Sequence, residues 1–272
     1  MVNVESFDQL LGQIEILKTQ RKGFLTNFYH DRKKVTLWVN YNILFYHTIE
    51  DTLFVFKKSD NFYSLFYFTT DTEQLKKALM LLRNELPETA LVIDIIGNEV
   101  SIKKVESAFI ENSFKNYTSL CRMSRAISEK ELDSYFNICY ALQEDALSIE
   151  LILKRYFDPL CEQIPLLEEI IEWIDLKHIF VYKKCDLIIG LLIFDLVGVT
   201  SYLKYWFTHP EHRDKKIGSQ LLRKFFAESN STKRQLFWVL EENENAIKRY
   251  HHYGFKCENM YDKVLIHQLK NK

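Results

Sequence analysis

The sequence predicts an α/β fold of two similar halves, each a mixed, mostly antiparallel twisted sheet flanked by helices. Short runs of β-branched and aromatic residues alternate with segments that carry apolar residues at helical spacing. Only seven glycines and four prolines occur in 272 residues, so few elements are forced to break early. The order of elements in the first half returns in the second half, which indicates an internal repeat.

The first half begins with a helix over about residues 4–19, where Leu10, Ile14 and Leu17 recur at helical spacing. Apolar and aromatic runs predict the strands that follow, at 35–39, 43–46, 53–57 and 62–68, with a hairpin turn at 58–61. The rest of this half is a helix capped by Asp71 or Thr72, a buried strand at 91–96, a helix around 105–109 and a strand at 117–123.

A polar stretch at 124–131 is expected to connect the halves, which places the two domains at 1–126 and 127–272. The second half opens with two helices, at about 129–157 and 162–174, separated by a break at Asp158-Pro159. Its remaining elements are predicted as strands 178–184, 187–196 and 200–208, helix 217–229, strand 235–240, helix 244–253 and strand 256–267.

Composition narrows the class of protein. The net charge of -1 creates no global field that would attract nucleic acid or an anionic membrane surface. Five scattered cysteines without a C-x-x-C pair indicate neither a zinc site nor a redox pair, and free thiols suit a reducing compartment. We find no signal-peptide pattern and no apolar run near the ~20 residues that span a bilayer. We therefore expect a soluble, cytoplasmic protein without a metal.

A basic loop between the strand at 200–208 and the helix at 217–229 carries the clearest functional pattern. Pro210 ends the strand, and Arg213, Lys215 and Lys216 follow directly before the helix. The first amides of a helix have no partner within it, and the helix dipole is positive there, so this arrangement suits phosphate. Gly218 would let the backbone approach a ligand closely. The structural alternative is a surface turn with solvated lysines.

This loop resembles the acyl-CoA-binding motif R/Q-x-x-G-x-G/A of the GNAT superfamily of N-acetyltransferases. Arg213 and Gly218 match that motif, whereas Lys216 stands where its first glycine is usual. A second stretch resembles the family's N-x-x-A-x-x-x-Y-x-x-x-G-F motif, with matches at Asn243, Ala246, Tyr250, Gly254 and Phe255. The two motifs together, in this order, predict two GNAT-like halves with the acyl-CoA site in the second.

The resemblance implies that acetyl-CoA, or another acyl-CoA, lies in a V-shaped gap between the splayed strands 202–208 and 235–240. Backbone groups of Phe207 and Thr208 would hold its pantetheine arm. The remaining residues implied in binding are Arg213, Asp214, Lys215, Lys216, Ile217, Gly218, Ser219 and Asn243. The amides from Asp214 to Ser219 would hold the diphosphate, and no metal is implied.

The acyl transfer that the resemblance implies needs an acid that protonates the departing thiolate and a base that takes a proton from the attacking amine. Tyr250 occupies the position of the family's acid, and the structural alternative is that it only packs on the sheet. Glu241 and Glu242, after the strand at 235–240, are the nearest candidate bases, and Asp195 is a third. Four histidines near the loop and the last helix also stay open as candidate bases: His209, His212, His251 and His252. Deprotonation of the amine through ordered water, without a dedicated base, is a further alternative.

The first half is expected to be a GNAT-like domain that has lost its cofactor site. Ser113-Phe114-Lys115 stands where Gly254-Phe255-Lys256 stands in the second half, which aligns Phe109 with Tyr250 and Ile102 with Asn243. The loop at 69–73 carries acids instead of Arg, Lys or Gly, so it would cap a helix and repel phosphate. Two unrelated α/β halves with a shared pattern are the alternative.

The predicted function is transfer of an acetyl or other short acyl group from coenzyme A to a primary amine, by direct attack in a ternary complex. We expect a small-molecule or peptide amine as acceptor, no nucleic acid or membrane as partner, and leave a homodimer open. Glu144 and Asp145, on the expected acceptor wall, would suit a cationic amine. A non-catalytic acyl-CoA-binding or regulatory protein is the first alternative, and a protein–protein scaffold is the second.

Overall fold

A computed structural model describes residues 1–20, 23–82, 89–127 and 137–267, apart from the side chain of Asp214. The chain divides into two compact units. Unit 1 holds Met1–Leu120 and the segment from Asn259 on, and unit 2 holds Cys121–Glu258. Strands β7 (Lys115–Ala126) and β13 (Lys256–His267) each cross from one unit into the other. The expected connection at 124–131 is therefore still strand up to Ala126, while the domain ranges themselves stay a prediction.

Unit 1 contains a sheet with the strand order β1-β3-β4-β5-β6-β13. Its strands are β1 Val2–Asn3, β3 Leu44–Ile49, β4 Thr52–Lys58, β5 Phe62–Thr69 and β6 Ala90–Gly97, with the short β2 Leu25–Thr26 paired to β5. Neighbours along this order are antiparallel, except that β5 and β6 are parallel. The observed strands β3 to β6 agree with the predicted runs because each run is apolar and bounded by turn residues.

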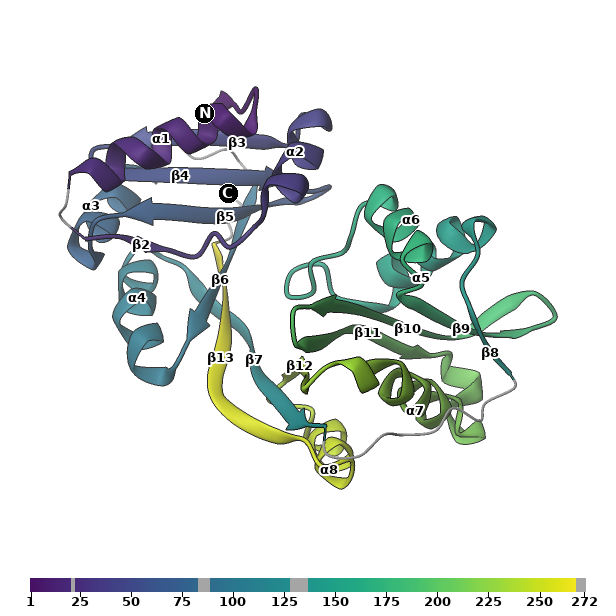
Figure 1. Ribbon diagram of the computed structural model, residues 1–272. Helices are drawn as coiled ribbons and strands as arrows, with labels where there is room; N and C mark the ends of the chain where they lie inside the picture. The colour runs from purple at the N-terminus through teal and green to yellow at the C-terminus, as the bar shows by residue number, and fades with distance from the viewer. Residues whose placement is uncertain (21–22, 83–88, 128–136, 268–272) are drawn as a thin grey trace. The chain divides into compact units, whose positions relative to one another are not determined.

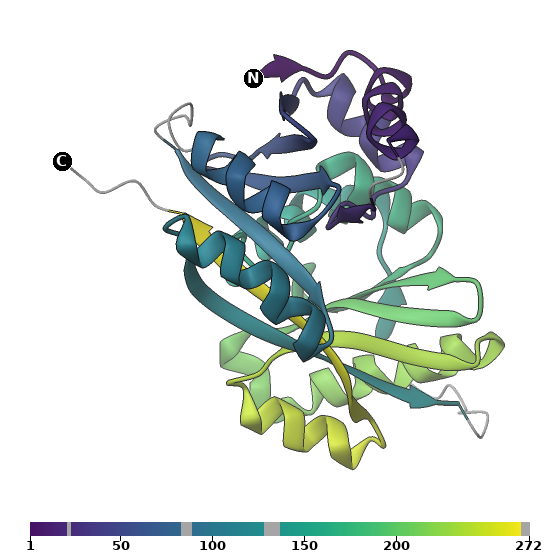
Figure 2. The same ribbon diagram turned by 90° about the vertical axis from the view of Figure 1, so that its left-hand side faces the viewer.

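Helices cover both faces of this sheet. Helices α3 (Thr72–Leu82) and α4 (Glu99–Glu111) share one apolar core with Leu65, Leu91 and Ile93 of the sheet. Figure 2 shows these two helices on the same side of the strands. Helices α1 (Phe7–Thr19) and α2 (Arg32–Asn40) lie on the other side, where Trp38 stacks on Phe66. The mixed, twisted α/β fold predicted for this half is confirmed.

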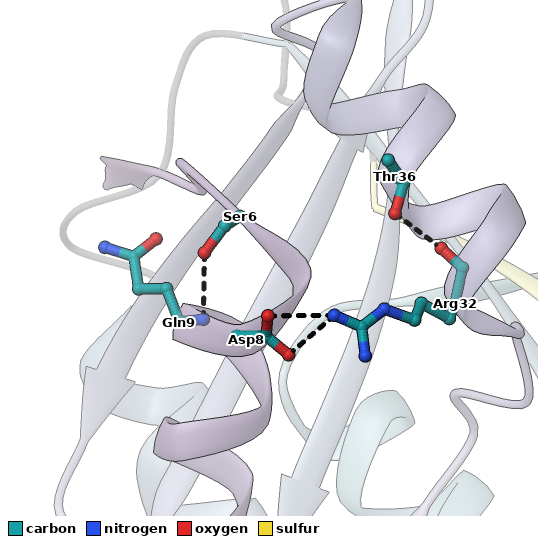
Figure 3. A network of polar contacts seen from close by, with 5 residues as sticks. All are labelled: Ser6, Asp8, Gln9, Arg32 and Thr36. Carbon is teal, nitrogen blue, oxygen red and sulfur yellow. Dashed lines mark hydrogen bonds and ion pairs between the residues drawn. The ribbon is translucent and has the colours of Figure 1, made fainter.

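A polar network connects α1 to α2 (Figure 3). The Ser6 hydroxyl accepts a hydrogen bond from the Gln9 amide at the start of α1, 3.1 Å away. Arg32 donates to both carboxylate oxygens of Asp8, at 2.8 and 3.0 Å, and the Thr36 hydroxyl donates to the Arg32 carbonyl. Both charged side chains are about two-thirds exposed, so we expect this pair to contribute no more than about 1 kcal/mol.

The prediction of a strand at 35–39 is wrong, because these residues form α2. The Asp31 carboxylate caps this helix by accepting a hydrogen bond from the Lys34 amide at 2.8 Å. Val35 and Trp38 lie one helical turn apart, and both are buried. The β-branched and aromatic content of this stretch favoured a strand, but the N-cap and the three-residue apolar spacing determine the structure.

Unit 2 contains a second sheet with the order β12-β11-β10-β9-β8. Its strands are β8 Ile138–Tyr140, β9 Ile179–Lys184, β10 Leu187–Val197, β11 Thr200–Thr208 and β12 Arg234–Leu240. Its helices are α5 Ala146–Tyr156, α6 Leu167–Asp175, α7 Ile217–Glu228 and α8 Glu244–His252. Figure 1 shows α5 and α6 on one face of the sheet and α7 on the other. None of the described helices has the length and apolar character needed to cross a bilayer.

The prediction of a helix over 129–157 is wrong for the described residues that precede Ala146. Residues 128–136 lie outside the described residues, and Ile138–Tyr140 form β8, which pairs with β9. The α-helix begins only at Ala146, after a short 3-10 turn that ends at Asp145. The Asp145 carboxylate holds this turn by accepting a hydrogen bond from the Leu142 amide at 2.8 Å.

The predicted repeat is visible in how α4 and α8 end. The Phe114 amide donates to the Phe109 carbonyl, and the Phe255 amide donates to the Tyr250 carbonyl, both at 3.1 Å. Ser113 and Gly254 lie at the same place in these caps, with positive φ angles of 71° and 83°. The alignment of Phe109 with Tyr250 therefore holds.

The alignment of Ile102 with Asn243 does not hold for the helix starts. Asn98 caps α4 and Asn243 caps α8. Helix α4 has 13 residues and α8 has nine, so α4 begins one turn earlier relative to the shared ending.

Candidate functional site

Strands β11 and β12 of unit 2 are parallel neighbours that separate after a short ladder. They pair only through Thr200–Tyr202 and Arg234–Leu236, although β11 continues to Thr208 and β12 to Leu240. On its other side, β11 stays paired with β10 along its length. Backbone groups of β11 that face β12 beyond Tyr202 therefore have no ladder partner in that strand. This is the splayed pair that the resemblance implied.

A β-bulge lies in the unpaired part of β11. Tyr205 faces Ile193 and Leu203 faces Phe194, so Lys204 is one extra residue in β11. The bulge turns Leu203 and Tyr205 to opposite faces of the sheet, although their spacing would place them on the same face. Bulges are frequent next to active sites because they redirect backbone groups. Sequence reasoning missed this bulge, and no glycine or proline marks it.

The loop after β11 is a 3-10 turn that ends at an unusual residue. Pro210–Lys215 form the turn, and Lys216 adopts the left-handed conformation with φ 57° and ψ 17° before α7 starts at Ile217. Left-handed backbone suits glycine, which explains why the GNAT motif has glycine at this position. The Lys216 side chain does not cap the helix. The first amides of α7, those of Ile217, Gly218 and Ser219, precede the first residue that can bond within the helix.

Several cations surround this helix start. Arg213, Lys215 and Lys216 are exposed, and the Lys215 ammonium lies 3.0 Å from Nδ1 of His212. Burial, together with the ammonium groups of Lys215 and Lys184, lowers the pKa of His212, so the imidazole is neutral at pH 7. Lys184, at the end of β9, is a basic residue of this cluster that sequence reasoning did not include. Asp214 lies in the same turn, but its side chain is outside the described part of the chain.

Gly218 is required by packing between α7 and β11. A Cβ atom at this position would lie 3.1 Å from the Thr208 hydroxyl and 3.2 Å from the Trp206 ring. The Trp206 indole also donates a hydrogen bond to the Gly218 carbonyl at 3.1 Å. Ile217 is buried against Gly190 of β10, so its side chain anchors the helix and only its backbone is available to a ligand. The role of Gly218 in ligand approach stays a prediction.

Tyr250 lies against both splayed strands. Its ring centroid is 4.2 Å from that of Phe237 in β12 and 5.7 Å from that of Trp206 in β11. The residue is only 9% exposed, and this burial raises the pKa of its phenol above the ordinary value of 10.0. The phenol is therefore fully protonated at neutral pH. This position is compatible with both interpretations of Tyr250: that it packs on the sheet, and that it faces the gap between the strands.

The candidate bases differ in their surroundings. Glu241 and Glu242 are exposed in the turn after β12. Burial alone would raise the pKa of Asp195, but contacts with His178 at 3.5 Å and Lys204 at 3.7 Å outweigh it and lower the net pKa. A carboxylate with a lowered pKa is a weaker base, which argues against Asp195 as the base.

Asn243 and Asp145 have structural partners. The Asn243 side-chain oxygen accepts a hydrogen bond from the Ala246 amide at 3.1 Å and so caps α8, while its role in cofactor binding stays a prediction. Asp145 is 6% exposed, lies 2.7 Å from the Lys183 ammonium and also accepts from the Leu142 amide. The expectation that Asp145 attracts a cationic amine is therefore wrong, because its charge is already paired. Glu144 is exposed.

Comparisons with known proteins agree with this geometry. Residues 175–257 match the family model described as an acetyltransferase (GNAT) domain. No curated protein matches the chain. Among the described residues, no group of three or more His, Cys, Asp or Glu side chains could hold a metal ion.

Three solved structures share the fold. A tandem GNAT protein from the clavulanic acid biosynthesis pathway has a TM-score of 0.60 at 9% identity, over 100% of this chain and 98% of that one. A GCN5-related N-acetyltransferase from Sphaerobacter thermophilus also scores 0.60 at 9% identity, over 81% and 78%. A GNAT-family acetyltransferase from Colwellia psychrerythraea scores 0.54 at 11% identity, over 97% of both chains. The chain thus has the fold of tandem GNAT proteins, and its residues 175–257 match the acetyltransferase (GNAT) domain model.

Proposed function

We propose that unit 2 is an acyl-CoA-dependent N-acyltransferase that moves an acetyl or other short acyl group to a primary amine. The observation that carries this proposal is the three-pair ladder of β11 and β12, which leaves a gap beside Trp206, Phe237 and Tyr250. The match to an acetyltransferase domain over 175–257 supports the same activity. The amine attacks directly, with both substrates bound.

The residues of this site fit a coenzyme A thioester. Backbone groups of β11 around Phe207 and Thr208 would hold the amides of the pantetheine arm. The amides of Ile217–Ser219 and the cations Arg213 and Lys216 would hold the diphosphate, since both sources of positive potential meet at the start of α7. The thioester supplies an activated acyl group when it is bound.

The reaction needs two proton transfers, one to the departing thiolate and one from the attacking amine, and different groups would carry them out. Tyr250 would donate its proton to the departing thiolate, and its raised pKa keeps that proton in place until then. Residues 200–208 of β11 include no carboxylate, so the amine would lose its proton through ordered water or to Glu241.

A non-catalytic acyl-CoA-binding protein is the second candidate. Two observations favour it: β11 lacks a carboxylate, and burial makes the Tyr250 phenol a weaker acid than an ordinary tyrosine. Transfer of a proton is less favourable when the pKa of the acid lies above that of the group that receives it. Binding would then be retained without turnover.

Acetyl-CoA titration followed by a thiol-release assay separates these functions. For an enzyme, acetyl-CoA raises the melting temperature in a concentration-dependent manner, and at least one amine of a chemically diverse panel releases free thiol. For a binding protein, the melting temperature rises but no amine releases thiol. No shift at millimolar acetyl-CoA refutes both.

The acid is tested with two tyrosines of the same region. Tyr250→Phe should lower kcat by about 10²–10⁴-fold with little change in the affinity for acetyl-CoA. Tyr253→Phe is the matched control, because Tyr253 directly follows α8 and packs on Phe226 instead of the splayed strands. Equal rates for wild type and Tyr250→Phe would remove the acid role.

A further inference from the structure

Unit 1 repeats the splayed geometry of unit 2. Strands β5 and β6 are parallel and pair only through Phe62–Ser64 and Ala90–Val92, although β5 continues to Thr69 and β6 to Gly97. The ladder therefore has the same three pairs as that between β11 and β12. Helix α3 follows β5 as α7 follows β11. Unit 1 thus has the frame of a second acyl-CoA site.

A segment of unit 1 itself lies in that frame. Strand β2, Leu25–Thr26, runs antiparallel to β5 and pairs with Thr69 and Phe68, as can be followed in Figure 1. The next residue, Asn27, is only 8% exposed. The segment therefore continues along β5 toward the end where the ladder with β6 begins.

The Asn27 side chain bridges the two separated strands. Its amide nitrogen donates to the Leu65 carbonyl of β5 and to the Asp94 carbonyl of β6, each at 3.1 Å. Its oxygen accepts from the Tyr67 amide of β5 at 2.8 Å. One side chain thus satisfies three backbone groups that the missing ladder leaves without a strand partner.

The start of the same segment lies on the turn before α3. Gly23 has φ 109°, and a Cβ atom there would be 2.6 Å from the Thr70 carbonyl oxygen. In the adjacent turn, the Asp71 carboxylate accepts a hydrogen bond from the Gln74 amide at 2.9 Å. A carboxylate of the chain therefore already occupies the positive end of α3, where a phosphate would bind.

We propose that residues 23–27 and Asp71 act as a built-in substitute for acyl-CoA in unit 1. Leu25–Asn27 take the backbone contacts of a pantetheine arm, and the Asp71 carboxylate takes the place of the diphosphate. Unit 1 then binds no acyl-CoA, and its gap is closed permanently by the chain. That the chain binds one acyl-CoA, in unit 2, rests on the proposed function; the closure of unit 1 does not.

Amide hydrogen exchange at Tyr67 and acetyl-CoA binding stoichiometry test this proposal. The Tyr67 amide should be strongly protected in the wild-type protein, and acetyl-CoA should not change its exchange in Arg213→Glu/Lys216→Glu, in which unit 2 binds none. Isothermal titration should give one equivalent per chain, and Arg213→Glu/Lys216→Glu should remove all binding. Slower exchange at Tyr67 on adding acetyl-CoA to that double variant, or a residual binding equivalent in it, would overturn the proposal.

Variants of Asn27 test the bridge directly. Asn27→Ala should speed exchange at Tyr67 by at least about tenfold and lower the melting temperature by several degrees, because three backbone groups, two of them in buried hydrogen bonds, lose their partner. Asn61→Ala is the control, since Asn61 is exposed in the β4–β5 hairpin and should change neither quantity. Unchanged exchange in Asn27→Ala would refute the bridge.

The exchange measurement also separates this proposal from the proposed function. A wild-type protein that binds no acetyl-CoA, yet protects Tyr67 through Asn27, would refute the function of unit 2 alone. Should Asn27→Ala fail to fold, the wild-type exchange and stoichiometry still decide the matter, because neither needs a variant in unit 1.

Discussion

Replacing Lys216 with glycine tests the geometry of the loop before α7. Lys216 has φ 57°, whereas its neighbour Lys215 belongs to the 3-10 turn. The two lysines are adjacent and both exposed, so the same substitution at each position compares two backbone conformations with little else changed. We expect Lys216→Gly to stabilise the protein and Lys215→Gly to destabilise it.

The magnitude follows from the backbone conformations. A non-glycine residue in the left-handed region costs about 1–2 kcal/mol, and the freer unfolded chain of a glycine variant offsets about 0.4–1 kcal/mol of this. Lys216→Gly should therefore gain about 0.8 kcal/mol, or roughly 2–3 °C in melting temperature. Lys215→Gly gains nothing from relief of strain and should lose about 0.5–1 kcal/mol.

Urea unfolding of the two variants and the wild type measures these differences. Binding of acetyl-CoA supplies a second measurement, because Lys216→Gly also removes an ammonium and should weaken binding by up to about fivefold, the scale of an exposed ion pair. Stability and affinity thus change in opposite directions at Lys216. Equal changes in stability for the two variants would refute the left-handed conformation of Lys216.

Two further predictions concern packing and pH in unit 2. Gly190→Ala places a Cβ atom 2.6 Å from the Ile217 side chain and should lower the free energy of unfolding, measured in urea, by about 1–3 kcal/mol. Gly12→Ala is the control, because the space around Gly12 is open. Equal stability of the two variants would contradict the packing of Gly190 against Ile217. Burial would raise the pKa of Glu258, but hydrogen bonds from Ser124, Arg122 and Arg234 outweigh it and lower the pKa below 4.5. The free energy of unfolding of the wild type should therefore exceed that of Glu258→Gln by its full amount at pH 7, and this difference should shrink as the pH falls below 4.5. A difference that does not depend on pH would argue against a lowered pKa of Glu258.

Elements with long apolar patterns were predictable from sequence. The predicted strand at 200–208 and helix at 217–229 agree with β11 and α7, because alternating or helically spaced apolar residues and clear turn residues define them. The short α2 was mistaken for a strand, since a window of nine residues with Val35 and Trp38 allows both periods. The two-residue β2 carries no pattern of its own.

The site was predictable only in part. The GNAT motifs predicted the splayed strands, which the short β11–β12 ladder confirms, while the roles of the loop and of Tyr250 stay predictions. No local pattern marks the bulge at Lys204 or the end of that ladder. The left-handed backbone of Lys216 could have been inferred, because the family has glycine there. The bridge made by Asn27 could not, since its partners Leu65, Tyr67 and Asp94 are distant in the chain and meet it only in the folded unit.

A crystal structure with coenzyme A bound tests the central claim most directly. The account predicts the pantetheine arm between β11 and β12, the diphosphate at the amides of Ile217–Ser219, and the sulfur next to the Tyr250 hydroxyl. Coenzyme A bound elsewhere on unit 2, or in the gap between β5 and β6, would contradict it.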